Sequence, residues 1–99
     1  MAVKNTALKY RVSVEDYMNP GNFKSNPTIA AGDFKIDKDG GGFNNLTNLP
    51  TVSPAGSITV LIDLTATEMN ADVVTIIAVD QTSPKEWSDG TFCLITTAS

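Results

Sequence analysis

Histidine is absent from the chain, and cysteine occurs once, at Cys93. A Ser-His-Asp triad, a Cys-His pair and a histidine-ligated zinc site are therefore excluded, and so is a disulfide bond within the chain. The apolar runs are too short to cross a bilayer, and the first residues lack the apolar core of a signal peptide. A lone thiol without a signal indicates synthesis in a reducing cytoplasm.

Positive charge is also scarce, because seven Lys and Arg residues stand against eleven Asp and Glu, which gives a net charge of −4. This acidic balance argues against a general phosphate-binding or nucleic-acid-binding role. The length of 99 residues suits one domain, residues 1–99, because a second core would not fit. Residues 1–6 are expected to form a flexible N-terminal arm, which either becomes ordered against a neighbouring subunit or frays.

Alternation of apolar and polar residues is the clearest pattern that the chain does contain. It occurs at residues 8–14, 33–37 and 57–64, and it is typical of half-buried strands. Residues 73–80 are almost continuously apolar, which predicts a strand covered on both faces. The last strand is expected at residues 91–97.

The connectors are rich in Gly, Asn and Pro, which favour turns. Glycines at 40–42 predict a tight turn, and a short edge strand is expected near 28–31. Thr65 with Glu68 three residues later matches a capping box, so one short helical turn is expected near 65–71. We therefore predict an all-β fold, a small antiparallel β-sandwich of five to seven strands that is Ig-like or jelly-roll-like.

Asp37 and Asp39 lie in a glycine-rich segment that superficially resembles a calcium loop. An EF-hand loop starting at Asp37 needs Asp or Asn at position 41 and Glu at position 48, where this chain has Gly41 and Asn48. A solvated hairpin turn is the better interpretation. Whether these two carboxylates bind a cation stays open at this point.

The other candidate groups give no catalytic arrangement. No spacing places two carboxylates face to face, as a general acid–base pair requires, so four acidic residues are expected at strand ends and turns: Asp63, Asp72, Asp80 and Asp89. Cys93 has no histidine to activate its thiol and is expected in the core. We assign no catalytic, cofactor-binding or metal-binding residue, and we do not expect an enzyme.

Trp87 lies in a polar loop between residues 81 and 90. The preferred interpretation is a lid that closes one end of the core. The alternative is an exposed aromatic anchor on which sugar rings stack, in a module that binds carbohydrate or a host surface.

Three segments, in this order, resemble a module of tailed-bacteriophage virion proteins. They are G-D-F-K-I-D-K-D-G-G at residues 32–41, N-L-T-N-L-P-T at 45–51 and L-T-A-T-E-M-N-A-D at 64–72. The resemblance implies a non-enzymatic β-sandwich building block of tail, baseplate, fibre or head-surface proteins. Because no fibre shaft or receptor-binding domain follows Ser99, it implies a head-decoration or tail/fibre accessory subunit.

The same resemblance implies the partners. They are further copies of the chain and neighbouring capsid or tail subunits, in a virion assembled after synthesis in the host bacterial cytoplasm. No cofactor, nucleic acid or membrane is expected. Binding would come from strand pairing, arm docking and apolar contacts repeated by virion symmetry.

Overall fold

The computed structural model describes residues 2–81 and 84–97 of the chain. Within these residues the regular structure consists of seven strands and no helix. The strands are β1 Leu8–Val12, β2 Phe34–Lys38, β3 Phe43–Asn45, β4 Thr51–Val52, β5 Val60–Leu64, β6 Val73–Ala78 and β7 Gly90–Ile95. It follows that the described part of the chain has no helix able to span a membrane.

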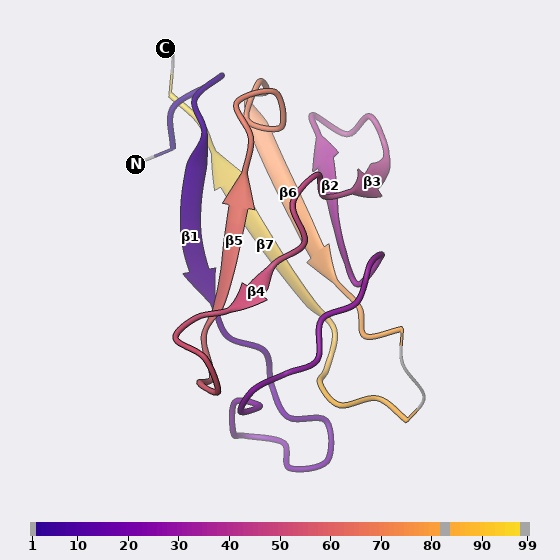
Figure 1. Ribbon diagram of the computed structural model, residues 1–99. Helices are drawn as coiled ribbons and strands as arrows, with labels where there is room; N and C mark the ends of the chain where they lie inside the picture. Colours follow the sequence, from indigo (N-terminus) through magenta and orange to yellow (C-terminus); the bar gives the residue numbers. More distant parts are fainter. Residues whose placement is uncertain (1, 82–83, 98–99) are drawn as a thin grey trace.

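The strands form two sheets that lie one behind the other (Figure 1). One sheet has the order β1-β5-β4 and the other has the order β3-β2-β6-β7. Every pairing between these strands is antiparallel. The predicted fold class, a small antiparallel β-sandwich, is therefore confirmed.

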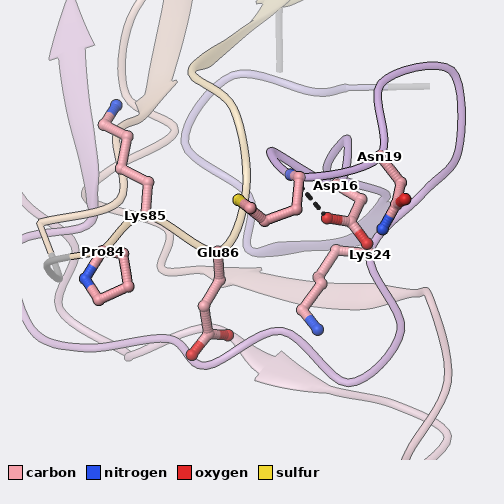
Figure 2. A pocket seen from close by; sticks show the side chains of 7 residues that line it. Asp16, Asn19, Lys24, Pro84, Lys85 and Glu86 are labelled. Atoms are coloured by element: carbon pink, nitrogen blue, oxygen red, sulfur yellow. Dashed lines mark hydrogen bonds between the residues drawn. The ribbon is translucent and has the colours of Figure 1, made fainter.

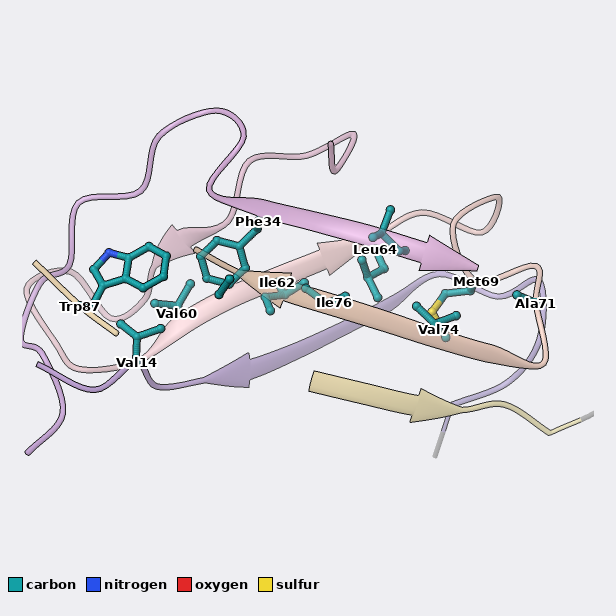
Figure 3. Packing of buried hydrophobic residues seen from close by; sticks show 12 residues of the cluster. Val14, Phe34, Val60, Ile62, Leu64, Met69, Ala71, Val74, Ile76 and Trp87 are labelled. Carbon is teal, nitrogen blue, oxygen red and sulfur yellow. The ribbon is translucent and has the colours of Figure 1, made fainter. Parts of the chain in front are cut away.

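The core lies between the sheets, and residues of β1, β2, β5, β6 and β7 point into it (Figure 3). Along β5, Val60, Ile62 and Leu64 are fully buried, which confirms the alternation expected for this segment. Burying each such side chain is worth about 1.5–3 kcal/mol. Ile58, which was expected on the same inner face, precedes the strand and is 39% exposed.

The interpretation of residues 73–80 as a strand covered on both faces is wrong. β6 does lie in the middle of its sheet, between β2 and β7. Val74 and Ile76 face the core and are fully buried, but Val73 on the opposite face is 37% exposed. A two-layer sandwich packs only one face of each sheet, so an apolar run in a central strand does not require a second cover.

One smaller expectation also differs from the structure. Residues 28–31 belong to no strand, and Ala31 lies in a turn, so the short edge strand expected there is absent. Near the expected helical turn, residues 66–69 form a single hydrogen-bonded turn, in which the Met69 N–H donates to the Thr65 carbonyl at 3.1 Å. The Ala71 N–H turns back to the Met69 carbonyl at 2.9 Å, which ends the helical path after one turn.

Candidate functional site

Hydrogen bonds join the three segments that resemble the phage module. The buried Glu68 carboxylate accepts the N–H groups of Thr65 at 2.9 Å and Thr47 at 3.0 Å, so it links the second segment to the third. The Glu68 N–H donates in return to Thr65 Oγ1 at 3.2 Å, which completes the expected capping box around a single turn.

The first segment is joined to the third in the same way. Asp39 Oδ1 accepts the N–H groups of Val73 at 2.9 Å and Asp72 at 3.1 Å. Lys38 Nζ donates to the Thr67 carbonyl at 3.1 Å. We call Asp37, Asp39 and Glu68 the acidic turn cluster, because each of these carboxylates fixes a turn.

Asp37 shapes the turn that joins β2 to β3. Its carboxylate accepts the N–H of Gly42 at 2.7 Å and of Gly40 at 2.9 Å. Positive φ angles at Asp39 (54°) and Gly40 (81°) reverse the chain here. The expected hairpin turn is confirmed. The two carboxylates that resembled calcium ligands, Asp37 and Asp39, both accept hydrogen bonds from backbone N–H groups. The described residues contain no group of three or more acidic or Cys side chains placed to hold a metal.

Trp87 closes the opposite end of the core, as the preferred interpretation predicted. Its side chain is fully buried, and the indole N–H donates to the Thr28 carbonyl at 3.2 Å. Its ring lies 5.6 Å from the Phe34 ring, centroid to centroid (Figure 3). The alternative of an exposed sugar-stacking anchor is wrong, because no face of the indole reaches solvent.

Buried carboxylates also fix the loops around Trp87. Asp33 accepts the N–H groups of Ala30 at 2.9 Å and Gln81 at 3.1 Å, while Asp80 accepts the N–H of Glu86 at 2.7 Å. Asp80 was expected as a cap, although not as a buried one. The role of Asp33 was not predicted, since its partner Gln81 is 48 positions away and leaves no local signal.

The remaining carboxylates expected at strand ends lie at the surface or half-buried. Asp72 pairs with Lys4 at 3.0 Å, and Asp89 pairs with Lys85 at 2.6 Å. The hydrogen bond that the Lys85 ammonium donates to Asp89 raises the pKa of Lys85. Asp63 is half-buried on β5.

A surface cleft of about 470 Å³ lies beside the loop that follows β1 (Figure 2). It is lined by Asp16, Met18, Asn19, Lys24, Pro84, Lys85 and Glu86. The Asp16 carboxylate accepts the Met18 N–H at 3.0 Å, and Glu86 accepts the Thr28 N–H at 3.1 Å. Lysines and carboxylates alternate around the cleft, so it favours neither an anion nor a cation.

The prediction that Cys93 is buried in the core is wrong, because Cys93 is exposed. In β7 the core-facing residues are Phe92 and Leu94, so the residues between them point outward. Ile95 is 76% exposed and lies directly beside Val73 of β6. β7 is also the last strand of its sheet. β7 therefore combines exposed apolar side chains with an edge that pairs with no other strand of the described residues.

The N-terminal arm docks on the chain itself. The Lys4 N–H donates to the Thr97 carbonyl, and the Thr97 N–H donates to the Ala2 carbonyl, both at 2.9 Å. The Asn5 N–H donates to the Met69 carbonyl at 3.0 Å. Residues 2–5 thus find backbone partners within the chain, and Met1 lies outside the described residues. Docking of the arm on a neighbouring subunit stays a prediction.

Tyr10 is the polar exception in the core region. Its hydroxyl is buried and has no hydrogen-bond partner among the residues that the structure describes. Burial raises the pKa of the Tyr10 phenol above its ordinary value. This buried hydroxyl without a hydrogen bond therefore lowers the stability of the fold.

No family model, curated protein or solved structure matches the chain significantly. The functional argument therefore depends on two features of the molecule itself. One is the acidic turn cluster, whose three carboxylates belong to the phage-like segments. The other is the outward side of β7.

Proposed function

We propose that the protein is a non-enzymatic structural subunit of a tailed-phage virion, present in multiple copies as a head-decoration or tail/fibre accessory subunit. The proposal starts from the three segments that resemble the phage module. One observation carries it further: Glu68 accepts N–H groups from the second and third segments, and Asp39 of the first segment accepts the N–H of Asp72 in the third. The shared residues thus maintain the fold, which is what a structural building block requires.

The surface supports the same proposal. The carboxylates of the acidic turn cluster and of the Trp87 end accept backbone N–H groups, so they hold loops in place. The apolar groups left at the surface, such as Ile95, Met18 and Phe23, are 57–76% exposed. Exposed apolar groups on an otherwise acidic domain favour contact with other subunits.

In a virion, such contacts act through repetition. As a head-decoration subunit, the protein would clamp neighbouring shell subunits against the internal pressure of the head. As a tail or fibre accessory subunit, it would bridge rings or anchor fibres. In both positions the free energy comes from burying surface and pairing strand edges, multiplied by the symmetry of the particle.

The role of a carbohydrate-binding module lacks its anchor, since Trp87 is fully buried. A glycan array probed with the folded protein is expected to give no specific signal.

Quantitative mass spectrometry of purified particles tests the proposal. Particles of the phage that encodes the chain should contain it in many copies, at a fixed ratio to the major capsid or tail protein. Particles from a gene-deletion phage should lose the corresponding density in an electron-microscopy map. A chain that never co-sediments with mature particles would contradict the proposal.

A further inference from the structure

The four outer strands of the two sheets differ in how well they resist pairing with another chain. β3 and β4 are only three and two residues long. β1 carries Lys9 and Arg11, which are both exposed. β7 has six residues, Gly90–Ile95, and contains no charged residue and no proline. Its Cys93 is a free thiol. Charges, prolines and shortness are the usual protections of an edge strand, and β7 lacks all three.

The hydrogen-bond pattern shows which backbone groups of β7 point away from the sheet. The Thr96 N–H donates to the Asp72 carbonyl, next to the first residue of β6. Alternate residues therefore face β6, and Thr91, Cys93 and Ile95 face the open side. The arm agrees, because Thr97 makes its two bonds to the arm on that same open side. Among the described residues, no backbone group bonds to this part of the open side.

We propose that two copies of the protein pair through β7, antiparallel and about a two-fold axis at Cys93. This inference rests on the proposed function, and it names the partner and the contact. In this register Cys93 of one copy faces Cys93 of the other, and Thr91 faces Ile95 on both sides. The outward N–H and C=O groups of Thr91, Cys93 and Ile95 are then all paired with those of the second copy. A shift of the register by two residues leaves some of these backbone groups unpaired. The two four-stranded sheets become one continuous sheet.

Side chains on the outer face support this register. Ile95 already lies beside Val73, and Thr91 lies beside Ile77. The two-fold pairing continues each row across the axis, so Ile95 of one copy packs beside Thr91 and Ile77 of the other. The 76% exposure of Ile95 in the single chain is thereby reduced. β7 therefore contributes an exposed apolar side chain to the outer face and also forms the open edge of the sheet.

The end of the open β7 edge, next to the N-terminal arm, fits the same arrangement. The arm occupies the open side of Thr97, so a second strand has to end before it reaches that residue. The register places Gly90, the first residue of β7 in the second copy, opposite Thr96, so that strand ends one residue before the arm. The length of β7 and the symmetry of its outward-facing residues Thr91, Cys93 and Ile95 about the axis therefore favour a second copy as the occupant.

A strand pair of this length buries less than the roughly 1,200 Å² of a stable standard interface. We therefore expect a dimer that depends on concentration and is favoured where copies are held close together. Sedimentation velocity of the full chain across a concentration series tests this. The wild type should convert from monomer to dimer, and a chain that stays monomeric up to millimolar concentration would overturn the proposal.

Two single variants locate the contact. Cys93→Lys places two ammonium groups beside the axis and should weaken the dimer by about tenfold or more. Phe43→Lys is the matched control, because Phe43 is 47% exposed on the same sheet but lies on β3 at the other edge. This control should dimerise like the wild type. Equal weakening by the two variants, or by Phe43→Lys alone, would reject β7 as the interface.

Disulfide trapping with copper–phenanthroline tests the register. Cys93 pairs should lie about 5.5 Å apart, Cα to Cα, which is within the range for a disulfide. Thr91→Cys in a Cys93→Ser background places the thiols roughly 13 Å apart or more and should not cross-link. Adding Ile95→Cys to that variant should restore cross-linking. Trapping of the Thr91→Cys variant as readily as the wild type would overturn the register. These outcomes concern the isolated protein, so they are independent of whether the chain is found in virions.

Discussion

Within the described residues, backbone polar groups are hydrogen-bonded at the loop end around Trp87 but unpaired along the open edge of β7. At the loop end, buried carboxylates of Asp33 and Asp80 accept N–H groups that no strand would pair. Along β7, the outward groups of Thr91, Cys93 and Ile95 have no partner within the described chain. Because unpaired backbone groups need a donor or acceptor elsewhere, the contrast separates a closed surface from one open to association.

The largest expected effect comes from opening the closed end. Trp87→Ala should lower the free energy of unfolding by about 3–5 kcal/mol, because it leaves a cavity beside Phe34 and frees the Thr28 carbonyl. Urea unfolding followed by circular dichroism measures this, since the variant has no tryptophan left for fluorescence. Tyr17→Ala, at a side chain that is 51% exposed, is the control and should change stability by under about 0.5 kcal/mol. Similar losses in both variants would contradict the lid.

Glu68→Ala should cost about 2 kcal/mol, because the N–H groups of Thr47 and Thr65 lose their shared acceptor. Glu68→Gln keeps one carbonyl acceptor and should cost roughly half as much. Urea titration of both variants at neutral pH makes the comparison. If Glu68→Ala were as stable as the wild type, the acidic turn cluster would not hold the phage-like segments together.

These effects show what the sequence could and could not predict. The alternation in β5 identified the inner face, because polar residues separate the apolar ones. The same reasoning fails for β7, because Cys93 and Ile95 are as apolar as Phe92 and Leu94. The sequence pattern therefore does not show which of the two pairs points into the core. Asp33 was missed because Gln81, its partner, is distant in the chain. Which strand ends a sheet depends on topology, so the candidate contact could not be located before the fold was known.

Tyr10→Phe should raise the free energy of unfolding by about 1 kcal/mol, because it removes a buried hydroxyl without a partner. The folded-state pKa of Tyr10 is raised above its ordinary value of 10.0, so its contribution to stability is intact below that pH and is lost as the pH rises further. The wild type should therefore lose stability in alkali faster than the variant. Parallel alkaline unfolding curves would contradict the burial of this hydroxyl.

The smallest change in stability is expected for a substitution on the solvent-exposed face of β7. Cys93→Ser should change the stability of the monomer by under about 0.5 kcal/mol, because the thiol points to solvent. At concentrations where the wild type is monomeric, a thiol reagent should modify Cys93 without denaturant. A thiol that reacts only after unfolding would instead place Cys93 in the core.

Hydrogen exchange, followed residue by residue by NMR, tests most directly whether the protein works through the edge of β7. In the dilute monomer, the amides of Thr91, Cys93 and Ile95 should exchange rapidly, while those of Phe92 and Leu94, which face β6, are protected. As the concentration rises and copies associate, the three outward amides should become protected together. If they still exchange as fast in the associated protein as in the monomer, β7 is not the contact and the account fails.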